Sequence, residues 1–326
     1  MKKLAITILA MIMVCLMIPS VAAAENIPVA TQNDDYIFEP EPTLTHEEIV
    51  AFLENSPNTQ QSSEYDVLLQ EKKQAKKVLA STTTTPSEKL NAKLVLAFNP
   101  AKKVYQLQKK TNQELQEMGF SAERIHLIRN FKGTDAELRD LSAVCSVSGN
   151  PKYTKNSSGQ WAKITFAFSW DKAPLLRYID AVVAQATPGF LPDKVPDVKC
   201  NINYLSPSGT PSYEYFDSSD LKQKSFEIGS PACFSFPVWE ERIAGVTRSW
   251  CYPQSGMATI VFRSKDTHQV QLSYGYAHAT RDISANIGIE FSGTDPAGSL
   301  GFCLSEKHYD MLPAPTGGKV CDSHFF

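Results

Sequence analysis

The stretch KITFAFSWDKAP, from Lys163 to Pro174, decides the fold. Its apolar residues Ile164, Phe166 and Phe168 alternate with small or polar ones, which is the two-residue period of a β-strand. The residues from Asp171 to Pro174 are typical of a turn. We therefore expect Phe168 and Trp170 to point into the core of a β-rich domain.

Similar strand-like runs follow along the chain: Tyr178 to Gln185, Val198 to Tyr204, Ser225 to Ile228, Ala258 to Phe262, Gln269 to Tyr276 and Ile287 to Phe291. The segments between them are rich in Pro, Gly, Ser and Asp and show little helical periodicity. Many short strands with few helices between them predict an antiparallel, sandwich-like domain over residues 143–326.

Residues 65–142, before this domain, carry helix signals instead. Thr111 with Glu114 and Thr134 with Glu137 form capping boxes, and Gly119 lies where a helix-ending glycine belongs. They predict three short helices, after amphipathic helices over Tyr65 to Leu79 and from Pro86 onward. The fold class we expect is α+β: a small helical N-terminal region followed by an antiparallel β-sandwich-like domain.

The charge pattern divides the N-terminal part again. Glu25 to Glu71 contains 11 acidic residues and no Lys or Arg, whereas Lys72 to Lys110 contains ten lysines and one acid, Glu88. We expect residues 25–64 to form an acidic, largely flexible leader with one short helix capped by Thr45 and Glu48. The lysines then lie on a solvated helix face or pair with that leader.

The first 24 residues have the features of a signal peptide. Lys2 and Lys3 precede an apolar run that is too short to span a bilayer as a helix, and Ala22 to Ala24 offer a peptidase site. We expect cleavage after Ala24 and a secreted chain, extracellular or cell-wall associated, with no transmembrane anchor once it is mature.

The number of cysteines also favours a protein that is secreted. Six remain after cleavage, all in the C-terminal part, and an even count outside the cytoplasm favours disulfides. We favour pairing of neighbours in sequence, although the connectivity is open and buried free thiols are the alternative. The pairs are Cys145 with Cys200, Cys233 with Cys251, and Cys303 with Cys321.

Composition excludes several classes of protein. A net charge of -3 offers no basic field for nucleic acid, so we expect no nucleic-acid partner. A mean hydropathy of -0.24 excludes a membrane bundle. The sequence has no zinc-protease helix, nucleophile elbow, phosphate-binding loop or dinucleotide motif, so we expect no cofactor and no metal.

One group of residues could support catalysis or ligand binding. His278 and Asp282 could act as an acid–base pair, and Tyr274, Tyr276 and Arg281 lie close to them in sequence. The alternative is a histidine at a strand end that bonds to the backbone.

Aromatic residues offer a second kind of site. All four tryptophans, Trp161, Trp170, Trp239 and Trp250, lie in the β-rich part. Exposed rings could stack on sugars while nearby acids bind hydroxyls, and core packing is the alternative. The candidate acids are Asp171, Asp180, Glu240 and Glu241.

The layout resembles a group of uncharacterised secreted proteins of Gram-positive bacteria. The likeness is carried by LQEMGFSAERIHLIRNF (Leu115 to Phe131), by ITFAFSWDKAP ending at Pro174, and by SYGYAHAT (Ser273 to Thr280). The resemblance implies a capped helical segment leading into a β-rich domain. It implies no activity and no catalytic residue.

Two functions follow as hypotheses. The favoured one is a non-enzymatic interaction protein whose β-domain binds glycan, cell-wall polymer or a protein partner, with Trp170, Asp171, Tyr274, Tyr276 and Arg281 as candidate contacts. The alternative is a secreted hydrolase that uses His278 and Asp282 and is kept latent by the leader.

Overall fold

The computed structural model describes residues 44–84, 86–156, 159–186, 191–192, 198–220, 232–264, 269–278, 302–311 and 324–325. All of them belong to one compact unit, Ile37–Phe326. The predicted signal peptide, residues 25–43 of the predicted acidic leader and the strands predicted at 225–228 and 287–291 lie outside the described residues.

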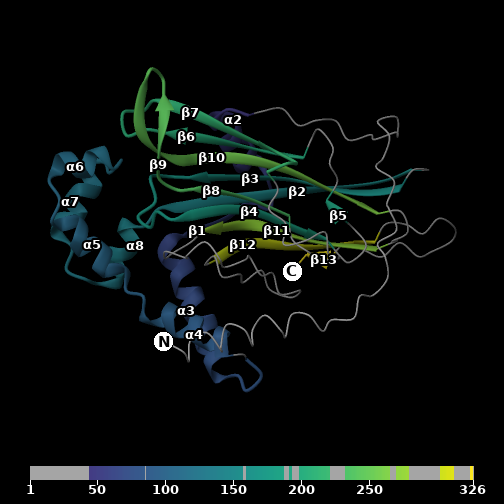
Figure 1. The fold of residues 1–326 in the computed structure, drawn as a ribbon, viewed down its shortest axis with the longest axis horizontal. Helices are drawn as coiled ribbons and strands as arrows, with labels where there is room; N and C mark the ends of the chain where they lie inside the picture. Colours follow the sequence, from purple (N-terminus) through teal and green to yellow (C-terminus); the bar gives the residue numbers. More distant parts are fainter. Residues whose placement is uncertain are drawn as a thin grey trace, which may run out of the picture. The chain divides into compact units, whose positions relative to one another are not determined.

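The helices of the N-terminal region begin where the sequence places their caps (Figure 1). Thr45, Thr111 and Thr134 form complete capping boxes, which confirms the three predicted N-termini. Asn99 caps α5, a helix that the sequence did not predict. The described helices are α2 His46–Asn55, α3 Glu64–Ala80, α4 Pro86–Ala97, α5 Pro100–Gln108, α6 Asn112–Glu117, α7 Ala122–Asn130 and α8 Asp135–Leu141.

The four helices α5 to α8 share one apolar core. Val104 of α5, Leu115 of α6, Ile128 of α7 and Leu141 of α8 are all buried in it. Leu175, which follows β3, enters the same core, so the helices are packed against the β-rich part. No described helix has both the length and the apolar character needed to span a membrane.

The β-rich part contains two antiparallel sheets, which confirms the α+β class (Figure 1). The first has the order β1-β2-β3-β10-β6-β7, with β5 and β9 also paired to β10. Its strands are β1 Gln60–Ser63, β2 Val144–Asn156, β3 Gly159–Trp170, β5 Leu191–Pro192, β6 Lys199–Leu205, β7 Pro211–Asp217, β9 Glu240–Ala244 and β10 Thr247–Ser264. The second has the order β13-β12-β11-β4-β8, formed by β4 Ile179–Ala186, β8 Ala232–Pro237, β11 Gln269–His278, β12 Phe302–Met311 and β13 His324–Phe325.

Aromatic side chains fill the space between the sheets. The Phe168 ring lies 4.4 Å from that of Tyr276 and 5.7 Å from that of Phe236, centroid to centroid. Phe166 and Tyr274 meet edge to face at 6.1 Å. The strand quoted first, β3, is buried along its whole length and on both faces. The predicted inward direction of Phe168 and Trp170 is confirmed.

The opposite face of β3 is covered by α2. Ile49 and Leu53 of this helix form a buried cluster with Ala167 of β3 and Met257 of β10. Residues 60–63 form β1 and pair with residues 144–147 of β2. Residues 44–64 of the predicted leader, which include the expected helix capped by Thr45 and Glu48, are therefore held to the sheet by an apolar helix face and a strand edge.

The predicted disulfides do not form among the described residues: Cys145, Cys200, Cys233 and Cys251 are free thiols. Cys145 and Cys200 lie on β2 and β6 with β3 and β10 between them. Three strand spacings of about 4.8 Å exceed the ~7 Å that a disulfide can bridge. Cys233 and Cys251 lie in different sheets. The partner predicted for Cys303, Cys321, lies outside the described residues.

Candidate functional site

His278, the predicted catalytic histidine, lies at the end of β11 in a closed polar network. Its Nδ1 is 2.6 Å from Oδ1 of Asp180, and its Nε2 is 3.4 Å from Oε1 of Glu64. The second Asp180 oxygen accepts a hydrogen bond from the Tyr276 hydroxyl, which itself accepts one from Trp170 Nε1 at 3.0 Å. His278 is 2% exposed and Asp180 is 0% exposed, so the network is shut off from solvent.

Glu64, the first residue of α3, anchors the other side of this network. Its Oε2 accepts hydrogen bonds from the backbone amides of Ala143 (2.8 Å) and Leu175 (2.9 Å), and its Oε1 accepts one from Leu176 (2.7 Å). A carboxylate that is bonded so fully stays ionised when buried. Sequence reasoning missed Glu64, because nothing local marks an acid 214 positions from His278 as its partner.

Nearby charges determine whether His278 and Glu64 are protonated. Burial alone would lower the pKa of His278, but the charges and hydrogen bonds of Asp180 and Glu64 outweigh it and raise that pKa to about 10. Burial would raise the pKa of Glu64, and His278 together with the backbone amides lowers it. The imidazolium therefore joins two carboxylates at neutral pH, and neither ring nitrogen is free to accept a proton.

The other predicted contact residues near His278 are also inaccessible. Trp170 and Tyr274 are each 2% exposed and Tyr276 is 1% exposed, so they belong to the core rather than to a surface site. Asp171 is exposed, and its side chain accepts a hydrogen bond from the Val144 amide at 2.7 Å. Arg281 and Asp282 lie outside the described residues.

Some of the tryptophans are packed in the core, and one is exposed as a sugar-binding site would require. Trp161 and Trp170 are core residues, whereas Trp250 on β10 is 50% exposed. The Trp250 ring stacks on Trp239 with centroids 6.0 Å apart and planes 10° from parallel. The Arg177 guanidinium lies 4.1 Å from the Trp239 centroid and 4.6 Å from that of Phe120. These four side chains form a stacked column, Phe120–Arg177–Trp239–Trp250.

The column ends on the outer face of the β9–β10 hairpin. Glu241 lies directly opposite Trp250 in the strand register, and Arg248 lies opposite Ile243. Directly opposite residues share one face of a sheet, so these four side chains lie together. Glu241 and Arg248 are 3.5 Å apart, with side chains 48% and 74% exposed. An aromatic ring thus lies beside an exposed carboxylate and an exposed guanidinium.

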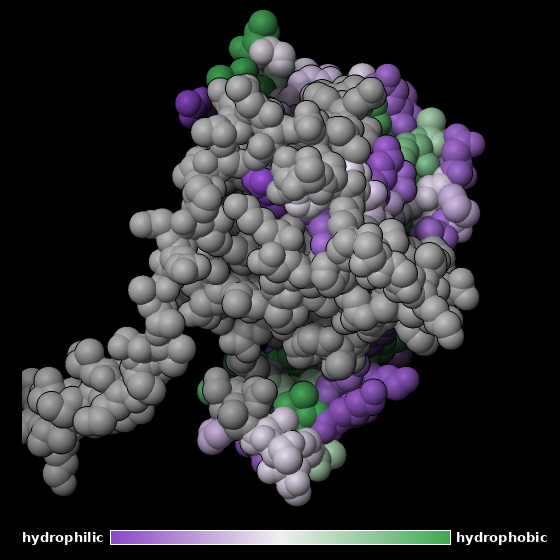
Figure 2. Space-filling view, turned by 90° about the vertical axis from the view of Figure 1, so that its right-hand side faces the viewer, coloured by the Kyte–Doolittle hydropathy of each residue, from purple (hydrophilic) through white to green (hydrophobic). Residues whose placement is uncertain are grey.

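The end of the hairpin is unusually apolar for an exposed turn. Gly245 has φ +67°, a conformation that favours glycine, and Val246 after it is fully exposed. Ile243 is 68% exposed. Figure 2 shows apolar side chains on the uppermost surface, where Figure 1 places this hairpin.

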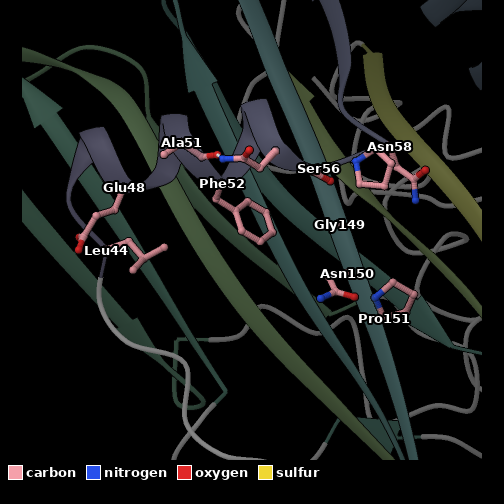
Figure 3. A pocket seen from close by; sticks show the side chains of 11 residues that line it. Leu44, Glu48, Ala51, Phe52, Ser56, Asn58, Gly149, Asn150 and Pro151 are labelled. Atoms are coloured by element: carbon pink, nitrogen blue, oxygen red, sulfur yellow. Dashed lines mark hydrogen bonds between the residues drawn. The ribbon is translucent and has the colours of Figure 1, made fainter.

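A separate groove lies between α2 and β2 (Figure 3). Its volume is about 690 Å³, and Phe52 extends into it from the helix. Asn58 from the loop after α2 and Asn150 with Pro151 from β2 form part of its lining. The described residues contain no group of His, Cys, Asp and Glu side chains that could hold a metal ion.

Comparisons with known proteins add little to this geometry. No family model matches the chain, and no curated protein matches it. A solved structure described as AvmM, which catalyses macrocyclization in alchivemycin A biosynthesis, is 9% identical over 52% of this chain and 91% of its own, with a TM-score of 0.23.

Two other solved structures are similar at the same low level. A pore forming protein is 5% identical over 56% of this chain and 85% of its own, with a TM-score of 0.19. Clostridium perfringens delta-toxin is 8% identical over 53% of this chain and 77% of its own, with a TM-score of 0.19. Similarities this low support no inference about function.

Proposed function

We propose that the protein is a secreted interaction protein that binds a glycan or cell-wall polymer on the Trp250 face of its β9–β10 hairpin. Residues 1–24 act as the signal peptide, and the chain works outside the cell or at the cell wall. The observation that carries the proposal is the half-exposed Trp250 ring, held flat at the end of a stacked column.

The chemistry of this face suits a sugar. A sugar ring presents C–H groups on one face and hydroxyls around its edge, so it needs a flat apolar surface with polar groups beside it. Trp250 supplies the surface. Glu241 accepts hydrogen bonds from hydroxyls and Arg248 donates them. Because Trp239 and Arg177 support the ring from below, little side-chain freedom is lost on binding.

The alternative of a secreted hydrolase that uses His278 and Asp282 receives less support. His278 is buried, and its two nitrogens face Asp180 and Glu64. A general base needs contact with the proton that it removes.

The proposal is tested by screening the full chain on an array of bacterial and plant glycans, including peptidoglycan fragments, and then titrating the strongest glycan. Trp250→Ala should weaken binding at least ~10-fold, equivalent to about 1.4 kcal/mol, because it removes the stacking surface.

Two variants control for position. Tyr215→Ala removes a similarly exposed ring from β7, and Phe52→Ala alters the groove beside α2; both should bind as the wild type does. A screen without a binding glycan, or full binding by Trp250→Ala, would contradict the proposal. Loss of binding only in Phe52→Ala would move the site to the groove.

A further inference from the structure

The N–H donors of the Arg177 guanidinium have a role that stacking on aromatic rings does not explain. The ring centroids of Phe120 and Trp239 lie 4.6 and 4.1 Å from its Cζ, so the guanidinium is held by two aromatic rings and its N–H groups remain for bonding at its edge. A guanidinium held in this way is preorganised to donate two parallel hydrogen bonds.

The donors at the edge of this plane have no described acceptor. Nε donates to the Pro174 carbonyl at 2.8 Å, whereas the two terminal nitrogens are buried and have no hydrogen-bond partner among the described residues. Burying charged donors without acceptors is costly, so the site calls for an acceptor that the described residues do not supply. The Arg177 residue as a whole is half-buried, so its exposed atoms are others than these two nitrogens.

The surroundings are rich in positive charge. Arg124 lies over the same Phe120 ring at 5.0 Å, and its terminal nitrogens donate to the carbonyls of Ala173 and Leu141. Burial lowers the pKa of Lys103 on α5, and the nearby charge of Arg177 lowers it further. Glu64 and Asp171 are nearby carboxylates; three backbone amides and His278 already occupy Glu64, and the Val144 amide donates to Asp171.

Tyr252 is a buried neutral group that both arginines influence. Burial raises the pKa of Tyr252 to about 12, although both arginines act against this rise. Its hydroxyl therefore stays protonated at neutral pH, and a protonated phenol can donate to an anion.

We propose that Arg177 forms a binding site for a single oxyanion group, a carboxylate or a phosphate. The group accepts the two parallel N–H bonds of Arg177 beside Phe120 and Trp239. This site takes an anion and needs no sugar, so it goes beyond the glycan-binding proposal.

Titration of the full chain with sodium phosphate, sodium acetate and sodium chloride at constant ionic strength tests this site. The thermal midpoint and the tryptophan emission are followed together, because Trp239 touches the guanidinium. Phosphate or acetate should raise the midpoint saturably and shift the emission, whereas chloride should do neither. The more effective of the two anions identifies the class of ligand.

Variants separate this site from its neighbours. Arg177→Lys keeps the charge but loses the two parallel donors, and it should weaken the anion at least ~10-fold. Lys103→Gln, at a half-buried position, should weaken it less. Lys76→Gln, at an exposed lysine on α3, should leave it unchanged.

The titration of the wild-type protein still tests the proposal if an Arg177 variant does not fold. Absence of a saturable effect of phosphate and acetate on the wild type would overturn the proposal. So would an Arg177→Lys protein that binds the anion as tightly as the wild type.

Discussion

At the scale of single residues, the histidine singled out in the sequence proves to be a structural connection. His278 joins Asp180 of β4 to Glu64 of α3, so one imidazolium links the second sheet to the first residue of a helix. A buried charge with two partners holds its surroundings tightly, because removing either partner leaves the other uncompensated. The network therefore stabilises the junction between the helices and the sheets.

The pH dependence of unfolding tests this role. The folded pKa of His278, about 10, lies above the ordinary histidine value of 6.5, so its contribution is complete below pH 6.5 and is lost as the pH rises toward 10. His278→Gln should cost about 3–5 kcal/mol of unfolding free energy near pH 6. The difference from wild type should shrink steadily between pH 6.5 and 10.

Chemical denaturation at several pH values measures this difference. His126→Gln, at an exposed histidine on α7, is the control and should follow the wild type at every pH. A His278→Gln deficit that stays constant from pH 6 to 10 would exclude an imidazolium in the network.

At the scale of helices and strands, strong local sequence signals were sufficient to predict where an element begins. The capping boxes at Thr45, Thr111 and Thr134 fix helix starts through contacts only three residues apart, so the sequence alone could predict them. β2 was missed because Gly149 and Pro151 interrupt its alternation, and β1 because QQSS has no apolar side chain. Pairing with neighbouring strands makes both segments extended, and pairing is not visible locally.

Gly149 shows how closely β2 approaches the second sheet. A Cβ atom at this position would lie 2.0 Å from Cε2 of Tyr274, whose ring is held against Phe166. Gly149→Ala should therefore destabilise the protein by more than about 3 kcal/mol, since the ring has no room to move.

Gly209→Ala is a matched control for Gly149→Ala. Gly209 has φ +80°, and a Cβ atom added there would have no neighbouring atom within 4 Å, so only backbone strain of about 1–2 kcal/mol is expected. Urea unfolding compares the two variants. A Gly149→Ala protein as stable as Gly209→Ala would show that Tyr274 does not lie over β2.

At the scale of the whole molecule, the two candidate sites use the same packing between helices and sheets. Phe120 follows α6, Arg177 precedes β4, Trp239 precedes β9 and Trp250 lies on β10, so the stacked column collects residues from four parts of the chain. The sequence could predict that tryptophans in the β-rich part matter. It could not tell which ones are exposed, because Trp170 and Trp250 both lie in strands and only tertiary packing distinguishes them.

Oxidative footprinting of the four tryptophans, with and without the glycan selected by the array, tests the central proposal most directly. Trp250 is 50% exposed and Trp161 and Trp170 are 2% exposed, so Trp250 should be modified much faster than these two in the free protein. The glycan should protect Trp250 and leave the oxidation of Tyr215 on β7 unchanged. Unaltered modification of Trp250 at a saturating glycan concentration would contradict binding on this face.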